Sequence, residues 1–200
     1  MDTHHRAVGE HGPLLLTAPG RADAERRTCD RLLRKETAAE RNVLYLVVEE
    51  DPADIVGRWR EAGGLPAALT VVYMGSGDPE TTGLPDGVTV FDCGPAALSL
   101  AGIQADRVIS EWADSTDRET VVCLTSLTAL LSEVSVQTLY RFLHVLQARL
   151  SAADVDHAHA HADPTEIDED ALGTVATLFE ARLSRENGTW RTDAQSADPD

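Results

Sequence analysis

The chain has 200 residues, with 34 acidic and 17 basic side chains, so its formal net charge is −17. Such a surplus of negative charge repels the phosphates of nucleic acids and of anionic lipids, which argues against both as partners. The longest apolar run, 43–48, is too short to span a bilayer, and residues 1–5 lack the basic and apolar regions of a signal peptide. We therefore expect a cytoplasmic chain with the length of one ordinary domain.

The kind of charge is also informative. Only Lys35 is a lysine among the 17 basic residues, and aromatic residues make up 4% of the chain. An acidic surface of this kind holds water and cations in molar salt, whereas its self-repulsion is unscreened at low salt. The composition resembles that of proteins from extreme halophiles; an acidic protein of a high-GC bacterium is the alternative.

The three cysteines, Cys29, Cys93 and Cys123, lie far apart and form no Cys-x-x-Cys pair. An odd number with this spacing argues against disulfides and against a structural zinc site. We interpret them as small buried residues.

Short apolar runs alternate with helical stretches along the chain. Runs that are apolar on both faces are typical of a mostly parallel sheet with helices on both sides. The pattern predicts strands at 14–17, 43–48, 69–74, 88–91, 120–124 and 155–162, and helices at about 22–40, 52–62, 95–113, 136–153 and 168–183. The fold class is therefore α/β.

The two ends of the chain lack this pattern. Asn187-Gly188 is a strong signal for a two-residue β-hairpin, which would close the sheet at one edge. Neither the residues before the first strand nor those from Thr192 onward show apolar periodicity. We predict disordered segments at 1–12 and 192–200 and a single domain at 13–191.

The turn after the first predicted strand has the position of a phosphate-binding loop, because the helix that follows offers free N–H groups and the positive end of its dipole. The turn contains Pro19, Gly20 and Arg21. When Gly20 is aligned with the inner glycine of such a loop, Asp23 stands in place of the phosphate-binding lysine and Ala24 in place of the magnesium-binding hydroxyl. A carboxylate there repels a triphosphate, so we interpret the loop as degenerate.

Glu49 and Glu50 lie between the second predicted strand and the next helix. Paired carboxylates at the carboxyl end of a strand point into the crevice where open α/β sheets bind ligands, and one of them could orient a water molecule for attack. Alternatively, both complement the dipole at a helix N-terminus. We favour this second interpretation because the loop supplies no lysine.

Thr125 and Ser126 follow the strand at 120–124. In a nucleotide hydrolase, an aspartate at this point holds the water shell of magnesium, whereas Thr125 offers only a hydroxyl. We interpret both residues as caps of the helical turn that follows.

Four segments follow one another in the order found in the RecA superfamily: the strand, turn and helix at 14–33, the segment with Glu49 and Glu50, the segment 121–131, and the hairpin. Residues 13–191 most resemble the KaiC-like branch of that superfamily. In that branch the strand carrying Glu49 and Glu50 supplies catalytic glutamates, and a strand ending in Asp-Ser-Leu-Thr-Ala-Leu-Leu supplies the metal-binding aspartate. Here that segment begins with Thr125. The resemblance implies a RecA-like, P-loop NTPase-like sheet that keeps the glutamates and lacks the lysine, the magnesium hydroxyl and the aspartate. Uncharacterised acidic proteins of halophilic archaea are similar.

His157, His159 and His161 alternate with alanines in the last predicted strand, so their side chains share one face at a spacing of about 6.6 Å. Alternating histidines can bind a transition metal. We favour a solvated or edge face instead, because no cysteine or second histidine group stands nearby in the sequence.

Arg27, Arg31, Arg34 and Lys35 recur at helical spacing in the first predicted helix. This basic face could receive an acidic protein partner or the acidic C-terminal region of another copy. A solvated face in which Asp30 pairs with Arg34 fits the pattern equally well.

The missing lysine and aspartate predict a pseudo-ATPase without a cofactor. We expect it to act as a regulatory or protein-interaction module, through a protein partner or self-association. The rival hypothesis is a diverged nucleotide-binding ATPase that uses Glu49 or Glu50, and metal binding by the three histidines is a third.

Lowering the salt concentration should loosen or unfold the domain, because 34 carboxylates repel one another when they are not screened. The measurement is a thermal melt from low to multimolar potassium chloride. A midpoint that stays constant over this range would remove the argument for adaptation to high salt.

Overall fold

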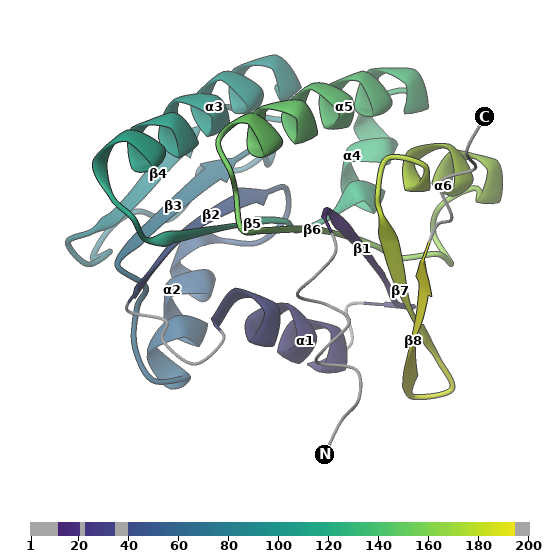
Figure 1. Ribbon diagram of the computed structural model, residues 1–200, viewed down its shortest axis with the longest axis horizontal. Helices are drawn as coiled ribbons and strands as arrows, with labels where there is room; N and C mark the ends of the chain where they lie inside the picture. Colours follow the sequence, from purple (N-terminus) through teal and green to yellow (C-terminus); the bar gives the residue numbers. More distant parts are fainter. Residues whose placement is uncertain (1–11, 21–22, 35–39, 195–200) are drawn as a thin grey trace.

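The computed structural model describes residues 12–20, 23–34 and 40–194. In this part of the chain, eight strands form one sheet in the order β4-β3-β2-β5-β6-β1-β7-β8 (Figure 1). All neighbouring strands run parallel except β7 and β8, which form an antiparallel hairpin. The strands are β1 (Leu14–Thr17), β2 (Arg41–Val47), β3 (Ala68–Tyr73), β4 (Val88–Asp92), β5 (Glu119–Leu124), β6 (His157–Ala162), β7 (Ala181–Glu186) and β8 (Thr189–Ala194).

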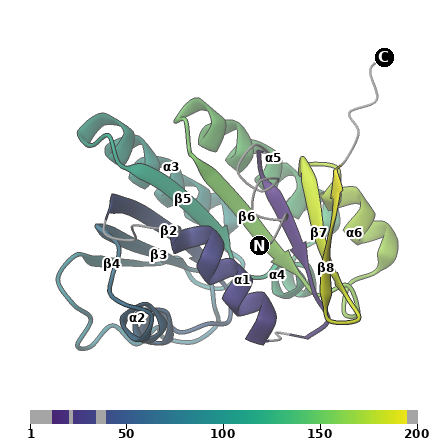
Figure 2. The same cartoon turned by 60° about the horizontal axis from the view of Figure 1, so that its bottom comes forward.

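Helices cover both faces of this sheet, so the predicted α/β class is confirmed (Figures 1 and 2). One face carries α1 (Asp23–Arg34) and α2 (Pro52–Glu61), and the other carries α3 (Leu98–Ser115), α4 (Leu127–Glu133), α5 (Val136–Ala152) and α6 (Glu169–Ala176). Among the described residues, no helix combines the length and hydrophobicity needed to cross a membrane.

Successive side chains of the central strands point to opposite faces of the sheet, so they contribute to a hydrophobic core on each face. In β2, Leu44 and Leu46 pack with the helices α3 to α6, whereas Val43, Tyr45 and Val47 pack with α1 and α2. Because both faces of β2 are buried, the strand is a continuous apolar run in the sequence. In α5, Leu139, Leu143, Leu146 and Leu150 are buried in the same core as Leu44 and Leu46, and Phe142 packs against them.

The helix predicted at 168–183 ends at Ala176. The last part of that prediction is wrong, because residues 181–186 form β7. β7 pairs in parallel with β1, which buries Ala181 and Leu183 against Leu14 and Leu16. The apolar spacing before Leu183 is compatible with a helix as well as a strand. Pairing with a strand from the other end of the chain decides between them.

The boundaries of the domain also differ slightly from those expected. The Asn187-Gly188 hairpin is confirmed, with φ of +49° and +82° at its two turn residues. β8 continues to Ala194, so the expected disorder from residue 192 begins too early. The hairpin register extends the ladder, because it pairs 192–194 with 181–183. At the other end, Gly12 is part of the described structure, and its N–H donates to Glu180 Oε2 (2.8 Å). The rest of the two predicted disordered segments, 1–11 and 195–200, lies outside the described residues.

Candidate functional site

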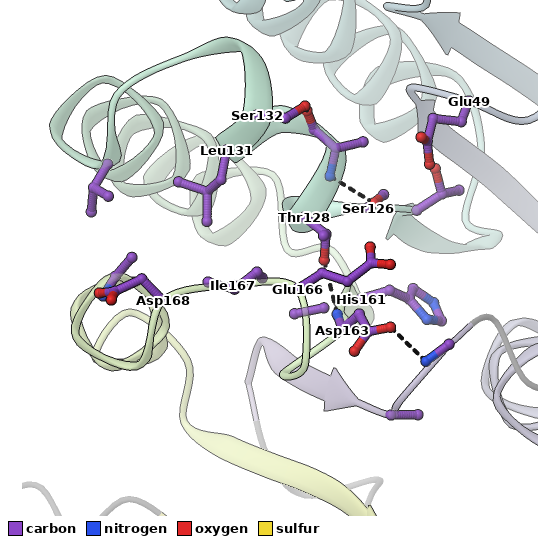
Figure 3. Close-up of a pocket in the computed structure, with 17 residues that line it drawn as sticks. Glu49, Ser126, Thr128, Leu131, Ser132, His161, Asp163, Glu166, Ile167 and Asp168 are labelled. Atoms are coloured by element: carbon purple, nitrogen blue, oxygen red, sulfur yellow. Dashed lines mark hydrogen bonds between the residues drawn. The ribbon is translucent and has the colours of Figure 1, made fainter.

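The carboxyl ends of β1, β2, β5 and β6 meet at one edge of the sheet and open into a cleft of about 690 Å³ (Figure 3). Open α/β sheets bind ligands at this position. Acidic, hydroxyl and apolar side chains line the cleft, and no lysine or arginine lines it within the described residues. The acidic residues are Glu49, Asp163, Glu166 and Asp168, and the larger apolar ones are Leu131, Val136 and Ile167.

Asp163 occupies the mouth of the turn that resembles a phosphate-binding loop. The Gly20 N–H, at the end of β1, donates to Asp163 Oδ2 (2.5 Å) (Figure 3). Pro19 and Gly20 are exposed, and Gly20 has a φ of +59°, a conformation that favours glycine. A backbone amide that could bind a phosphate oxygen therefore binds a carboxylate of the same chain.

The Asp163 carboxylate is held by several donors. Its Oδ1 accepts hydrogen bonds from the Thr165 N–H (2.8 Å) and hydroxyl (2.6 Å), while its own N–H donates to Thr128 Oγ1 (2.9 Å). Burial acts to raise the pKa of Asp163, but the hydrogen bonds from Thr165 and Gly20 outweigh it and hold the pKa below its ordinary value. Asp163 is therefore ionised and fixed in front of Gly20.

The remaining positions of the degenerate loop are only partly described. Arg21 lies outside the described residues, and Asp23 and Ala24 begin α1 with side chains that lie outside them as well.

Glu49 and Glu50 do not act as a pair. The exposed Glu49 lines the cleft, whereas both carboxylate oxygens of Glu50 accept hydrogen bonds from the Arg58 guanidinium on α2. The next residue, Asp51, caps α2 by accepting a hydrogen bond from the Ala53 N–H (2.9 Å). Only Glu49 is therefore placed to contact a ligand in the cleft.

Ser126 caps a helix as expected, and Thr125 does not. The buried Ser126 hydroxyl accepts a hydrogen bond from the Ala129 N–H (3.0 Å) at the start of α4. Thr125 lines the cleft, and its hydroxyl oxygen is buried without a hydrogen-bond partner among the described residues. A hydroxyl in this environment is a poor substitute for an aspartate that neutralises a metal ion.

The basic face expected on α1 is not one continuous surface. Arg31 is exposed, but the half-buried Arg34 donates to the carbonyl oxygen of Arg58 (2.9 Å), and its guanidinium lies 4.5 Å from the centroid of the Trp59 ring. Arg34 thus joins α1 to α2. The side chain of Arg27 and the whole of Lys35 lie outside the described residues.

The histidine strand is central, so the expected solvated or edge face is wrong for two of its three histidines. β6 lies between β5 and β1, and the exposed fractions of His159 and His161 are only 3% and 8%, while His157 is half-buried. The register places His159 opposite Cys123 of β5, and α1 crosses the same face with Cys29. The fold thus supplies the cysteines that are absent nearby in the sequence.

Cys29, Cys123, His159 and His161, here called the Cys₂His₂ cluster, are all buried, and their ligand atoms lie within 4.8 Å of one another. The two sulfur atoms are 3.6 Å apart, and His159 Nε2 lies 3.2 Å from Cys29 Sγ. His157 Nε2 lies 3.1 Å from His159 Nδ1 on the other side of that ring. These residue types in this arrangement are those of a metal centre.

The surroundings of the cluster favour a thiolate. A hydrogen bond with Cys123 holds the pKa of the Cys29 thiol well below its ordinary value, aided by His159 and His161, although burial opposes this effect. Burial raises the pKa of Tyr45 well above its ordinary value, so this neighbour stays neutral and accepts a hydrogen bond from Trp59 Nε1 (3.0 Å).

A second, smaller cavity extends from the cluster toward the surface. Its volume is about 50 Å³, and the buried residues that line it include Cys29, Tyr45 and His161. Charged side chains complete its wall, namely Arg26, Asp30, Glu50 and Arg58. His161 and Thr125 also line the larger cleft, so both residues lie between the two cavities.

A family described only as a family of unknown function, DUF7504, matches residues 12–184. The chain belongs to this family. No curated protein matches the sequence.

Two solved structures from Pyrococcus horikoshii share the fold of this DUF7504 protein. PH0250 has a TM-score of 0.58 at 11% identity, covering 99% of this chain and 94% of its own. The uncharacterized protein PH0321, in complex with an unknown peptide, has a TM-score of 0.62 at 14% identity, covering 91% of this chain and 82% of its own. At these identities the likeness concerns the fold alone.

Sequence reasoning missed Asp163 and the cysteine pair of this DUF7504 protein. Asp163 directly follows β6, just as Glu49 follows β2, so its place at the carboxyl edge was a signal that could have identified it. Cys29 and Cys123 gave no such signal, because only the packing of α1 on β5 brings them together.

Replacing Glu50 with Gln should destabilise the domain by about 1 kcal/mol, because it weakens a half-buried ion pair with Arg58. Glu49→Gln is the matched control, because Glu49 is exposed and its replacement should change the free energy of unfolding by less than about 0.5 kcal/mol. Urea unfolding at constant high salt measures both. Equal effects of the two substitutions would contradict the separate roles of these glutamates.

Proposed function

We propose that this DUF7504 protein is a non-catalytic regulatory or protein-interaction module built on a RecA-like, KaiC-like domain. The support lies in the order of its elements. The strand before the degenerate loop, the strand before Glu49 and the strand before Thr125 are β1, β2 and β5, and their carboxyl ends border one cleft. A RecA-like domain requires these three strand ends to meet at one cleft.

The hydrogen bond between Gly20 and Asp163 is the observation that carries the non-catalytic assignment. A phosphate bound at the start of α1 must displace the Asp163 carboxylate from the Gly20 amide. It must also enter a cleft that Glu49, Glu166 and Asp168 make negative. Without a neutralising lysine, repulsion among these charges opposes the binding of a triphosphate.

The same cleft suits a cationic protein segment. PH0321 forms a complex with an unknown peptide. In the present chain, the acidic Glu49 and Glu166 and the apolar Leu131 and Ile167 all line this cleft (Figure 3). A peptide that offers a basic side chain next to an apolar one would find both charge and shape complements here.

Calorimetry with magnesium and ATP in high salt should detect no binding, because neither the loop nor the Thr125 position compensates the charge of the triphosphate. Micromolar affinity would overturn the non-catalytic assignment. Phosphate release that disappears in Glu49→Gln would establish the rival ATPase, since a carboxylate that orients water acts in the transition state.

Replacing Glu166 with Arg should weaken the capture of a partner from native extract at native salt by about tenfold, because it reverses one charge in the cleft. Glu111→Arg is the matched control, since Glu111 is an exposed residue of α3 on a different part of the molecule. Identical capture by the wild type and both variants would show that the cleft is not the interaction surface.

A further inference from the structure

The Cys₂His₂ cluster joins three separate elements of the fold. Cys29 comes from α1, Cys123 from β5, and the two histidines from β6. We propose that this cluster binds one Zn²⁺ ion through all four side chains, as a closed structural site. This cluster lies between one face of the sheet and α1, and the proposal does not depend on what the cleft binds.

Two separations within the cluster are close to those of tetrahedral coordination. A Zn²⁺ ion about 2.3 Å from sulfur and about 2.0 Å from nitrogen separates two sulfur atoms by about 3.8 Å, and a sulfur from a nitrogen by about 3.5 Å. The observed separations are 3.6 Å between the sulfur atoms and 3.2 Å between Cys29 Sγ and His159 Nε2. These two separations are within a few tenths of an ångström of the coordinated values, and all the ligand atoms lie within 4.8 Å of one another.

The register of the sheet makes this arrangement stiff. Cys123 and His159 are direct neighbours across the β5–β6 ladder, and His161 lies two residues further along the same face. Three of the four side chains thus project from hydrogen-bonded strands rather than from loops, which fixes their spacing before any ion arrives. Only Cys29, on α1, must be brought to them by helix packing.

His157 orients one of the ligands. The short contact between His157 Nε2 and His159 Nδ1 occupies one nitrogen of the His159 ring and leaves Nε2 directed at Cys29 Sγ. Metal-binding histidines commonly use their second nitrogen in this way, because the outer hydrogen bond fixes the tautomer and the ring plane. His157 is therefore a positioning residue of the site.

The chemistry of the donors selects the class of metal. Two sulfur and two imidazole ligands favour Zn²⁺ over the hard cations Mg²⁺ and Ca²⁺, which prefer oxygen. Two thiolates and one Zn²⁺ ion sum to zero charge, so a fully buried site carries no net charge. A ligand thiol that still carries its proton releases it on binding, and the second cavity beside Cys29 offers the ion a path to the cluster.

The ion would attach α1 to the sheet. Among the side chains of α1 that the structure describes, Cys29 and Leu33 are the buried ones, and Leu32 packs only partly. Its C-terminal end is held by Arg41, whose guanidinium donates to the carbonyl oxygen of Leu33 (3.2 Å). A metal bond at Cys29 fixes the middle of the helix in the same way.

The first test measures metal in the untagged protein, purified in reducing buffer at high salt with zinc present. We expect about one Zn²⁺ per chain after gel filtration. Cobalt added to the chelator-treated chain should give the visible absorption of tetrahedral Co²⁺ together with a thiolate-to-cobalt charge-transfer band. Absence of bound zinc, or cobalt binding without the thiolate band, overturns the proposal. The sulfur signature separates this site from carboxylates or other histidines of the chain.

The second test uses matched cysteine variants. Cys29→Ser and Cys123→Ser should each weaken zinc binding by at least about tenfold, whereas Cys93→Ser should bind like the wild type, because Cys93 lies outside the cluster. Zinc retained equally by all three variants overturns the proposal. If a cluster variant does not fold, the cobalt spectrum of the wild type still decides, since it needs no substitution.

Discussion

The register of the parallel strands β5, β6 and β1 is the constraint on which the other features of this protein depend. It pairs His159 with Cys123 on one side and with Leu14 on the other, so the imidazoles face α1 within the core. It also aligns the strand ends, so that Asp163, just after β6, meets Gly20 beyond β1. A slip by one residue would exchange the faces of β6, placing alanines under α1 and histidines under the opposite helices.

Charge and donor chemistry divide the molecule into two distinct sites. The cleft presents carboxylates, with Asp163 already anchored to a backbone amide, a charge pattern that favours basic groups over polyphosphates in the function we propose. The Cys₂His₂ cluster presents sulfur and imidazole among buried residues. A soft or borderline metal ion prefers these donors to the carboxylate oxygens of the acidic surface.

Helix α1 and His161 connect these sites. The Gly20 turn at the cleft leads into α1, which then carries Cys29 over the cluster and Arg34 against Trp59 of α2. His161 belongs to the cluster and also lines the cleft. If both proposed sites bind their ligands, this shared imidazole is the residue through which binding at one would act on the other.

The sequence by itself determined the features that depend on neighbouring residues. Apolar runs at 14–17 and 43–48 gave the buried strands, Asn187-Gly188 gave the hairpin, and Ser126 gave the helix cap, because each follows from local backbone preferences. The missing lysine and aspartate at the candidate nucleotide site were also visible without a structure. These signals lie within a few residues of the element that they specify.

The tertiary structure decided everything that depends on which elements lie side by side. Ala181 and Leu183 form a strand rather than a helix because β1 is available to pair with them. Arg34 contacts Trp59 because α2 packs beside α1, and Glu50 folds back onto Arg58 of the helix that follows it. Histidines that alternate like a solvated face are buried against two cysteines from distant elements, since strand order is set by the burial of whole faces and leaves no trace in local periodicity.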